Sequence, residues 1–311
     1  MIVVLSLNTA IDRLMLVPGF AVGAVFRAER SVAVAGGKAL NVARVLRQLG
    51  QSARVVGTLG GMPEDFVRAW CNRAEVDGRW IRIEEDSRTC VIVIDPQSAR
   101  QTVLNEPGPN LSADEVWRID EAIDGAIQEG DTLCISGSLP PGVPASFYAD
   151  LVRRLQGRGV RVLVDASDQT LRLALESHPW AVAPNVSECA LALSQPEDPQ
   201  RLIVALSERV DHAMLTLGAE GLLYAHEGYA WRIRPPAICT VNAVGSGDAC
   251  VAGFLAGMNR GLPALDAIRL GVACGAANAA RFEPGIEDVA AVERLSALVR
   301  IDPLDPSQQR Q

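Results

Sequence analysis

Short apolar runs alternate with longer amphipathic stretches along the chain. The short runs are rich in β-branched residues and predict strands at 2–7, 54–57, 132–136, 161–165, 181–184 and 213–217. The longer stretches repeat their apolar residues with helical spacing and predict helices at 39–49, 63–74, 113–128, 144–157 and 200–210. A parallel sheet covered by helices on both faces produces this alternation. We therefore predict an α/β fold with a doubly wound, mostly parallel sheet flanked by helices.

Two segments depart from this rhythm, because 12–34 and 88–105 have strand patterns without an intervening helix. Within the second segment, 89–95 and 102–105 are joined by 96–100 in the manner of a hairpin. We expect both segments to form a small β lid that closes over a ligand and excludes water. The predicted units are a main domain, a lid and a tail, with bounds 1–11, 35–87 and 106–300 for the domain, 12–34 and 88–105 for the lid, and 301–311 for the tail.

Composition narrows the class of protein. With 311 residues, 49% of them hydrophobic, the chain can build a full-sized core without disulfides or metal. A formal charge of −8 and the lack of a long Lys/Arg run argue against a nucleic-acid partner. The seven cysteines are scattered and never form a C-x-x-C pair, which indicates core thiols in a reducing compartment. The first residues resemble neither a signal peptide nor a membrane span, so we expect a cytoplasmic protein with no membrane association.

A glycine-rich turn is the strongest candidate for chemistry. A strand-like run at 237–241 leads into 242–248, and an apolar helical pattern follows at 249–256. Gly245 and Gly247 would let backbone amides converge at a helix N-terminus, which favours a phosphate. Asp248 would lie beside that anion, where it could accept the proton of a hydroxyl that attacks a γ-phosphoryl group. The alternative is a tight turn in which Asp248 only caps the helix.

Two common nucleotide fingerprints do not fit. Gly36-Gly37-Lys38 lacks the earlier glycine and the Ser/Thr after lysine that a Walker A loop requires, and 245–253 is not G-x-G-x-x-G. A P-loop enzyme and a nicotinamide dehydrogenase are therefore both disfavoured.

Several segments together resemble the PfkB (ribokinase-like) carbohydrate kinase family, within it the 1-phosphofructokinase and tagatose-6-phosphate kinase branch. In family order they are NTAID at 8–12, GGKALNVAR at 36–44, EPGP at 106–109, SGSLPPG at 136–142, PNVSE at 184–188, TLGAEG at 216–221 and VGSGD at 244–248. The resemblance runs from about residue 2 to residue 285. It implies a ribokinase-like fold with a β lid, and ATP and Mg²⁺ as cofactors.

For catalysis and nucleotide binding the resemblance implies specific roles. Asp248 matches the catalytic base, and the amides of Gly245, Ser246 and Gly247 match the anion hole. Further matches are Asn185 and Glu188 for Mg²⁺ held through water, Thr216, Gly218 and Gly221 for the nucleotide loop, and Asn278 for an adenine contact. Two alternatives stay open: a capping box that joins Asn185 to Glu188, and a helix-packing contact at Asn278.

For the acceptor, the resemblance implies a sugar phosphate. Asp12, Gly37 and Asn41 match contacts to the sugar, while Arg27, Lys38, Arg88 and Ser138 resemble the residues that hold the substrate's own phosphate. The alternatives are a flexible turn at the glycine pair and solvated surface arginines.

Three positions differ from the common pattern of this branch. Ala183 replaces a lysine, Cys90 replaces an asparagine, and Ala39 replaces a glycine. None of these changes affects the implied base or anion hole, although the alanine at position 183 could remove one contact to the nucleotide.

The resemblance implies transfer of the ATP γ-phosphoryl to fructose 1-phosphate, which gives fructose 1,6-bisphosphate. Tagatose 6-phosphate and fructose 6-phosphate are alternative acceptors, and a non-catalytic sugar-phosphate sensor is an alternative of another class. We also expect a homodimer formed through the lid, using the apolar residues Val32, Val34, Val91 and Val93.

Overall fold

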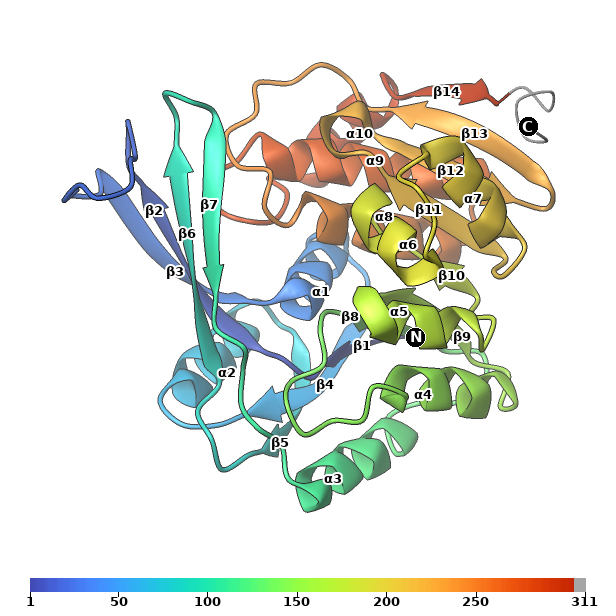
Figure 1. Cartoon of the computed structure of the whole chain (residues 1–311), viewed down its shortest axis with the longest axis horizontal. Helices are drawn as coiled ribbons and strands as arrows, with labels where there is room; N and C mark the ends of the chain where they lie inside the picture. Colours follow the sequence, from blue (N-terminus) through green and yellow to red (C-terminus); the bar gives the residue numbers. More distant parts are fainter. Residues whose placement is uncertain (305–311) are drawn as a thin grey trace.

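The computed structural model describes residues 1–304 and centres on a ten-stranded sheet (Figure 1). The strand order is β14-β13-β12-β11-β10-β9-β8-β1-β4-β5. Seven strands are parallel: β1 (Ile2–Ser6), β4 (Ala53–Leu59), β5 (Asp77–Arg82), β8 (Thr132–Ser136), β9 (Arg161–Asp165), β10 (Ala181–Val182) and β11 (His212–Thr216). An antiparallel extension follows: β12 (Leu222–His226), β13 (Tyr229–Arg234) and β14 (Arg300–Pro303).

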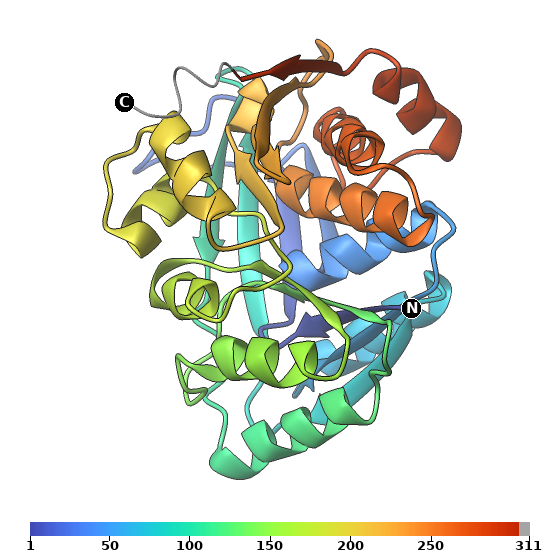
Figure 2. The same cartoon turned by 90° about the vertical axis from the view of Figure 1, so that its right-hand side faces the viewer.

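Helices cover both faces of this sheet (Figure 2). One face packs against α1 (Lys38–Gln48), α2 (Pro63–Arg73), α8 (Ser246–Asn259), α9 (Ala264–Ala279) and α10 (Val289–Ser296). The other packs against α3 (Ala113–Asp124), α4 (Phe147–Gln156), α5 (Asp168–Leu175), α6 (Val186–Leu193) and α7 (Pro199–Ser207). Alternate residues of β1 enter the two cores, because successive side chains of a strand point to opposite faces. The predicted doubly wound α/β fold is confirmed.

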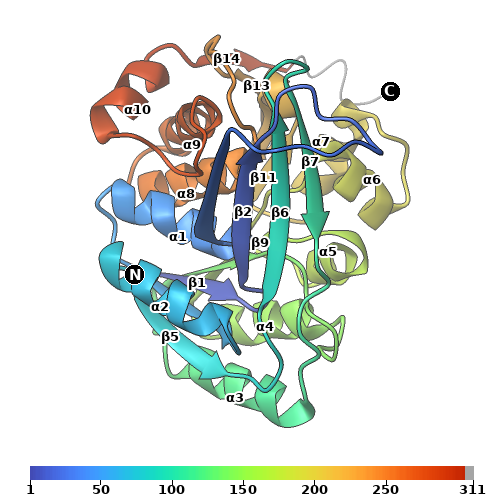
Figure 3. The same ribbon diagram turned by 90° about the vertical axis from the view of Figure 1, so that its left-hand side faces the viewer.

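A second sheet of four strands stands apart from the main one (Figures 1 and 3). Its order is β3-β2-β6-β7, formed by β2 (Ala10–Leu16), β3 (Arg30–Gly36), β6 (Arg88–Asp95) and β7 (Arg100–Asn105). β6 and β7 form the predicted hairpin, whereas β2 and β6 pair in parallel. The separate small sheet is thus present, and its role as a lid stays a prediction, as do the bounds of the two units.

The face of the small sheet that packs against the main domain is apolar. Leu14, Val34, Ile92 and Ile94 form a buried cluster, with Val32 packed against it. Strand alternation places Val91 and Val93 on the opposite face. The four valines expected to form one dimer surface therefore do not share a face.

Other expectations need correction near the end of the chain. Residues 237–241 form no strand, because Pro235 and Pro236 cannot donate ladder hydrogen bonds and the Val241 amide bonds to Ala279 instead. Residues 301–303, assigned to a tail, belong to β14, and residues 305–311 of that tail lie outside the described residues. Four strands were not predicted: β5, β12, β13 and β14.

Six of the seven cysteines are buried and all are free thiols, as expected for core residues. No helix within residues 1–304 has both the length and the apolar character needed to cross a bilayer.

Candidate active site

The predicted anion hole is a turn at the start of α8. Gly245 is the N-cap with φ of 82°, a left-handed conformation that glycine adopts without strain. No side chain caps the helix. The Ser246 amide donates to the Ala243 carbonyl at 3.1 Å, while the amides of Gly245 and Gly247 have no acceptor within residues 1–304 and stay free to bind a ligand. A Cβ atom added to Gly247 would have no neighbour within 4 Å, which means that the space above the helix start is open. This turn can accept a phosphate group.

Asn278 of α9 holds that turn in place. Its Nδ2 donates to the Val244 carbonyl at 2.9 Å and to Ser246 Oγ at 3.1 Å, while its Oδ1 accepts from the Gly285 amide at 2.7 Å. The residue is only 1% exposed. These contacts favour the alternative in which Asn278 joins two parts of the protein, and not the one in which it contacts adenine.

Asp248 lies in the first turn of α8 and is 6% exposed. Its Oδ2 accepts a 2.9 Å hydrogen bond from Asn41 Nδ2, and Asn41 Oδ1 accepts one of 2.6 Å from Arg44 Nη1. Burial raises the pKa of Asp248 to about 7, an effect opposed by Lys38 and by the Asn41 hydrogen bond. Because Asp248 makes no capping bond, its carboxylate is available to take up a proton near neutral pH.

An ion pair lies beside this carboxylate. Lys38 Nζ, at the start of α1, is 2.9 Å from Asp165 Oδ1 at the end of β9 and 4.0 Å from Glu188 Oε1. Ser136 Oγ donates to Asp165 Oδ2 at 2.9 Å. Burial disfavours the ammonium group, but Asp165, Asp248 and Glu188 raise the pKa of Lys38 above its usual value. Lys38 is therefore a fixed positive charge at the carboxyl edge of the sheet.

The residues predicted for the nucleotide lie at the ends of β10 and β11. Asn185 and Glu188 form the capping box of α6, with 2.9 Å from the Asn185 amide to Glu188 Oε2 and 2.8 Å for the reciprocal bond. Asn185 also forms an isolated β-bridge with Thr216. A short 3₁₀ turn follows, and Gly218 at its start and Gly221 just after it both have positive φ. The capping box that was the alternative for this pair is thus present. It uses Oε2 of Glu188, while Oε1 takes no part in it.

The residues predicted for the sugar meet at the junction of the small sheet and α1. Asp12 of β2 is buried, and its Oδ2 accepts a 3.3 Å hydrogen bond from the Gly37 amide. A Cβ at Gly36 would come within 2.1 Å of the Asp12 carboxylate, so only glycine fits there. Burial raises the pKa of Asp12, while Gly37, Arg44 and Arg88 oppose that shift.

The predicted phosphate-binding residues are only partly assembled. Arg88 Nε donates to the Asn8 carbonyl at 3.3 Å, and Asn8 Nδ2 donates to Ser138 Oγ at 3.1 Å. Arg88 and Ser138 are thereby joined through Asn8. Arg27 instead lies in the exposed loop between β2 and β3, where it has no hydrogen bond or ion pair to any residue in 1–304.

Comparison with known proteins identifies the family. The family model for "pfkB family carbohydrate kinase" matches residues 1–288. The chain belongs to the pfkB carbohydrate kinase family. It is accordingly a sugar kinase, a phosphotransferase.

Solved structures agree with this assignment. Escherichia coli phosphofructokinase-2, solved with potassium, is 25% identical, with 96% of this chain and 98% of that chain covered and a TM-score of 0.87. A possible 1-phosphofructokinase from Thermotoga maritima is 24% identical, with coverages of 98% and 100% and a TM-score of 0.88. Thermotoga maritima ribokinase is 19% identical, with coverages of 95% and 98% and a TM-score of 0.77. At their identities the last two bear on the fold alone, which is ribokinase-like.

Sequence reasoning missed two polar residues of this pfkB kinase. Asp165 holds Lys38, and Arg44 holds Asn41. Asp165 ends a correctly predicted strand at the carboxyl edge of the sheet, where parallel α/β proteins bind ligands, and that position was the available signal. Arg44 lies three positions after Asn41 in α1, so the i, i+3 spacing of a helix was the available signal for that contact.

The positions that depart from the family pattern are all buried. Ala183 and Ala39 lie in the core, and Cys90 pairs across the small sheet with Asp12. Burial raises the pKa of Cys90 to about 11, so its thiol stays protonated at neutral pH.

The residues of this edge fit a nucleotide and a hydrated magnesium ion. The open turn at Gly247 leaves room for phosphate, and Glu188 Oε1 and the Asp165 carboxylate offer the oxygen donors that Mg²⁺ prefers. In the part of the chain that the structure describes, no group of three or more His, Cys, Asp or Glu is placed to hold a metal by itself.

Proposed function

We propose that this pfkB kinase transfers the γ-phosphoryl group of ATP to a primary hydroxyl of a phosphorylated ketohexose, with fructose 1-phosphate giving fructose 1,6-bisphosphate. The observation that carries the proposal is the Asp248 carboxylate, which is buried, has a pKa near neutrality and lies in the first turn of an uncapped helix. A carboxylate beside an anion hole costs stability, and proton transfer supplies a reason for it.

Asp248 acts as the general base in this proposal. Its carboxylate takes the proton as the acceptor hydroxyl oxygen forms a bond to the γ-phosphorus, while the bond from that phosphorus to the β–γ bridging oxygen breaks and ADP leaves. The amides of Gly245 and Gly247, which have no acceptor within residues 1–304, donate to the transferring oxygens; the Ser246 amide, also proposed for the anion hole, donates to the Ala243 carbonyl in this structure. Lys38, held by Asp165, adds positive charge at the same edge.

Magnesium would be held by Glu188 Oε1 and Asn185 through water, and when bound it supplies charge neutralisation for the nucleotide phosphates. Thr216, Gly218 and Gly221 line the strand end where the nucleotide would lie. Asn278 supports the anion hole from behind.

The acceptor side combines sugar and phosphate contacts. Asp12 and Asn41 offer buried polar atoms for hydroxyl groups, and Arg88 with Ser138 offers donors for the acceptor's own phosphate. Arg27 would join them through the loop between β2 and β3 once substrate is bound. Lys38 contributes less to phosphate binding than Arg88, since its ammonium already pairs with Asp165.

We also propose a homodimer through the small sheet. Val91, on the face away from the main domain, and exposed apolar residues of the loop between β2 and β3 support it, whereas Val93 is buried within the chain. The exposed fraction is 98% for Val22 and 100% for Val25. A single monomeric species in sedimentation velocity at micromolar concentration would rule this arrangement out.

Measuring ADP release tests the reaction. The purified chain is incubated with ATP, Mg²⁺ and one acceptor at a time: fructose 1-phosphate, tagatose 6-phosphate, fructose 6-phosphate, fructose or ribose. We expect the highest kcat/KM with fructose 1-phosphate and low activity with the free sugars. A preference for another hexose phosphate would correct the acceptor, and no turnover with any acceptor would favour the sensor alternative.

A further inference from the structure

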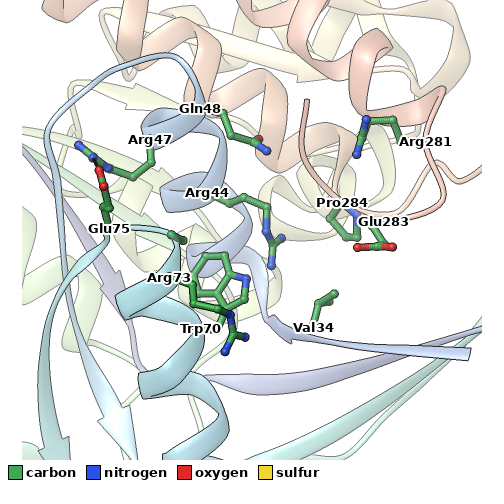
Figure 4. A pocket seen from close by; sticks show the side chains of 11 residues that line it. Val34, Arg44, Arg47, Gln48, Trp70, Arg73, Glu75, Arg281, Glu283 and Pro284 are labelled. Carbon is green, nitrogen blue, oxygen red and sulfur yellow. Dashed lines mark hydrogen bonds and ion pairs between the residues drawn. The ribbon is translucent and has the colours of Figure 1, made fainter. Parts of the chain in front are cut away.

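Arg44 of α1 is a buried cation behind the proposed base. It is 7% exposed and is one of four arginines that line a cavity of about 470 Å³ between α1, α2 and residues 281–284 (Figure 4). Its guanidinium donates to two neutral oxygens, Asn41 Oδ1 and the Ala35 carbonyl, and forms no ion pair within residues 1–304. A buried charge without a paired carboxylate costs free energy, so its retention needs an explanation.

Three contacts hold the Arg44 side chain in one position. Its guanidinium carbon lies 4.7 Å from the centroid of the Trp70 ring of α2. A Cβ atom added to Gly285 would come within 3.0 Å of Arg44 Cδ, so the segment after α9 packs against the aliphatic part of the side chain. Nη2 is bound to the Ala35 carbonyl of β3. The direction of the second donor, Nη1, is therefore fixed by the surrounding protein.

This fixed donor determines the orientation of the Asn41 amide. A guanidinium has donors and no acceptor, so the Asn41 atom that lies 2.6 Å from Nη1 must be the oxygen. The amide nitrogen is then left to donate to Asp248 Oδ2 at 2.9 Å. Without Arg44 the amide is free to turn over. Its oxygen would then face the carboxylate and could accept a hydrogen bond only from the protonated acid.

The charge of Arg44 also acts on two carboxylates of the candidate site. Burial lowers the pKa of Arg44 to about 10, and Asp12 and Asp248 oppose that shift, so the guanidinium stays protonated at neutral pH. Burial raises the pKa of Asp12, and Arg44 is one of the groups that oppose this rise. A single buried cation thus favours the ionised forms of a predicted sugar contact and of the proposed base.

Other ionisable groups also face Asp248. Within residues 1–304 they are Lys38 at the start of α1, Asp165 at the end of β9, Asp12 of β2 and the thiol of Cys134 in β8. Lys38 is the cation of this set, and its ammonium already pairs with Asp165. The hydrogen bonds that run through Asn41 are therefore a separate source of stabilisation for the ionised base.

We propose that Arg44 is a positioning residue for phosphoryl transfer, which holds the Asn41 amide as a donor to Asp248 and so keeps the base ready to accept a proton. This inference rests on the proposed role of Asp248 as the general base. Arg44 itself touches neither nucleotide nor acceptor, since it lies one side chain behind Asp248.

The pH profile of kcat/KM tests this role, because a purely structural loss would lower kcat/KM equally at every pH. Arg44→Met removes the charge and the donors. We expect its acid limb to lie at least about 0.5 pH unit above that of the wild type, with KM for ATP within about twofold. Arg44→Lys keeps a charge and a donor, and it should restore at least half of the shift. Arg47→Gln, in the same cavity, is the control and should keep the wild-type limb.

A double-variant cycle shows whether Arg44 acts through Asn41. In the Asn41→Ala background, Arg44→Met should move the acid limb less than half as far as in the wild-type background, because the amide that Arg44 orients is gone. Equal shifts in both backgrounds, or an unmoved limb in Arg44→Met, would overturn the proposal.

A measurement on the wild type decides the question if Arg44→Met does not fold. The Arg44 Nε–H signal is identified in a ¹H–¹⁵N spectrum by its loss in Arg44→Lys. It should shift with pH at the midpoint of the acid limb, and a signal that ignores this midpoint would contradict the proposal.

Failure of the proposed function would look different. If Asp248→Asn keeps the wild-type kcat, Asp248 is not the base, and the role of Arg44 falls with it. If Asp248→Asn loses turnover while Arg44→Met keeps the wild-type limb, the role of Arg44 alone is wrong.

Discussion

Asn41 donates a 2.9 Å hydrogen bond to Asp248, although 207 positions separate the two residues in the sequence. The contact joins the first helix of the chain to the helix that begins at the glycine-rich turn. It places a residue proposed to contact the acceptor directly on the proposed base, and the Asn41 hydrogen bond lowers the pKa of Asp248.

This contact predicts a specific change in pH dependence. Asp248 must be deprotonated to accept a proton, so kcat/KM should fall as pH drops below about 7. The Asn41 hydrogen bond lowers the pKa of Asp248, and Asn41→Ala should therefore move this acid limb to higher pH. The profile is measured from about pH 5 to about pH 9, with exposed Asn72→Ala as the control. An acid limb that stays in place or moves to lower pH would refute the coupling.

The same carboxylate should lower stability above neutral pH. Because burial raises its pKa from 3.8 to about 7, the folded state binds the proton more tightly than the unfolded chain does. The free energy of unfolding should thus decrease as pH rises through that window. Asp248→Asn removes this cost, so at pH 8 it should melt at least roughly 3 °C above the wild type, and the difference should close toward pH 4.

Thermal denaturation at the two pH values checks this, with exposed Asp211→Asn as the matched control. Equal melting temperatures of Asp248→Asn and wild type at pH 8 would mean that the buried carboxylate carries no such cost.

Asn278 should act on stability more than on nucleotide affinity. Asn278→Ala removes two hydrogen bonds to the turn and leaves the buried Gly285 amide without its acceptor, which should lower the free energy of unfolding by about 3 kcal/mol. Urea denaturation measures this, with Asn259→Ala at the exposed end of α8 as control. Unchanged stability together with a raised KM for ATP would instead support the adenine contact.

The sequence was sufficient for the fold class and for the neighbourhood of the site. Runs of β-branched residues at 132–136 and 161–165 correspond to β8 and β9 with the same bounds, because a strand buried on both faces has little choice of composition. The glycine-rich turn before α8 was readable for a different reason, since a left-handed position and free amides need glycine.

Contacts between distant segments could not be predicted. Lys38 looked like a free phosphate ligand, but it pairs with Asp165, a residue 127 positions away. The antiparallel strands β13 and β14 carry exposed polar residues and gave weaker patterns than the buried parallel strands. The arginine-lined cavity also depends on packing, since α1, α2 and residues 281–284 meet only in the folded chain.

The central claim is that Asp248 removes the proton from the acceptor hydroxyl. It is tested most directly by the kcat of Asp248→Asn with ATP and the best acceptor, measured beside the affinity of the same variant for ATP. We expect kcat to fall by at least about 100-fold while the Kd for ATP stays within about threefold of wild type. A kcat within about threefold of wild type would contradict the account.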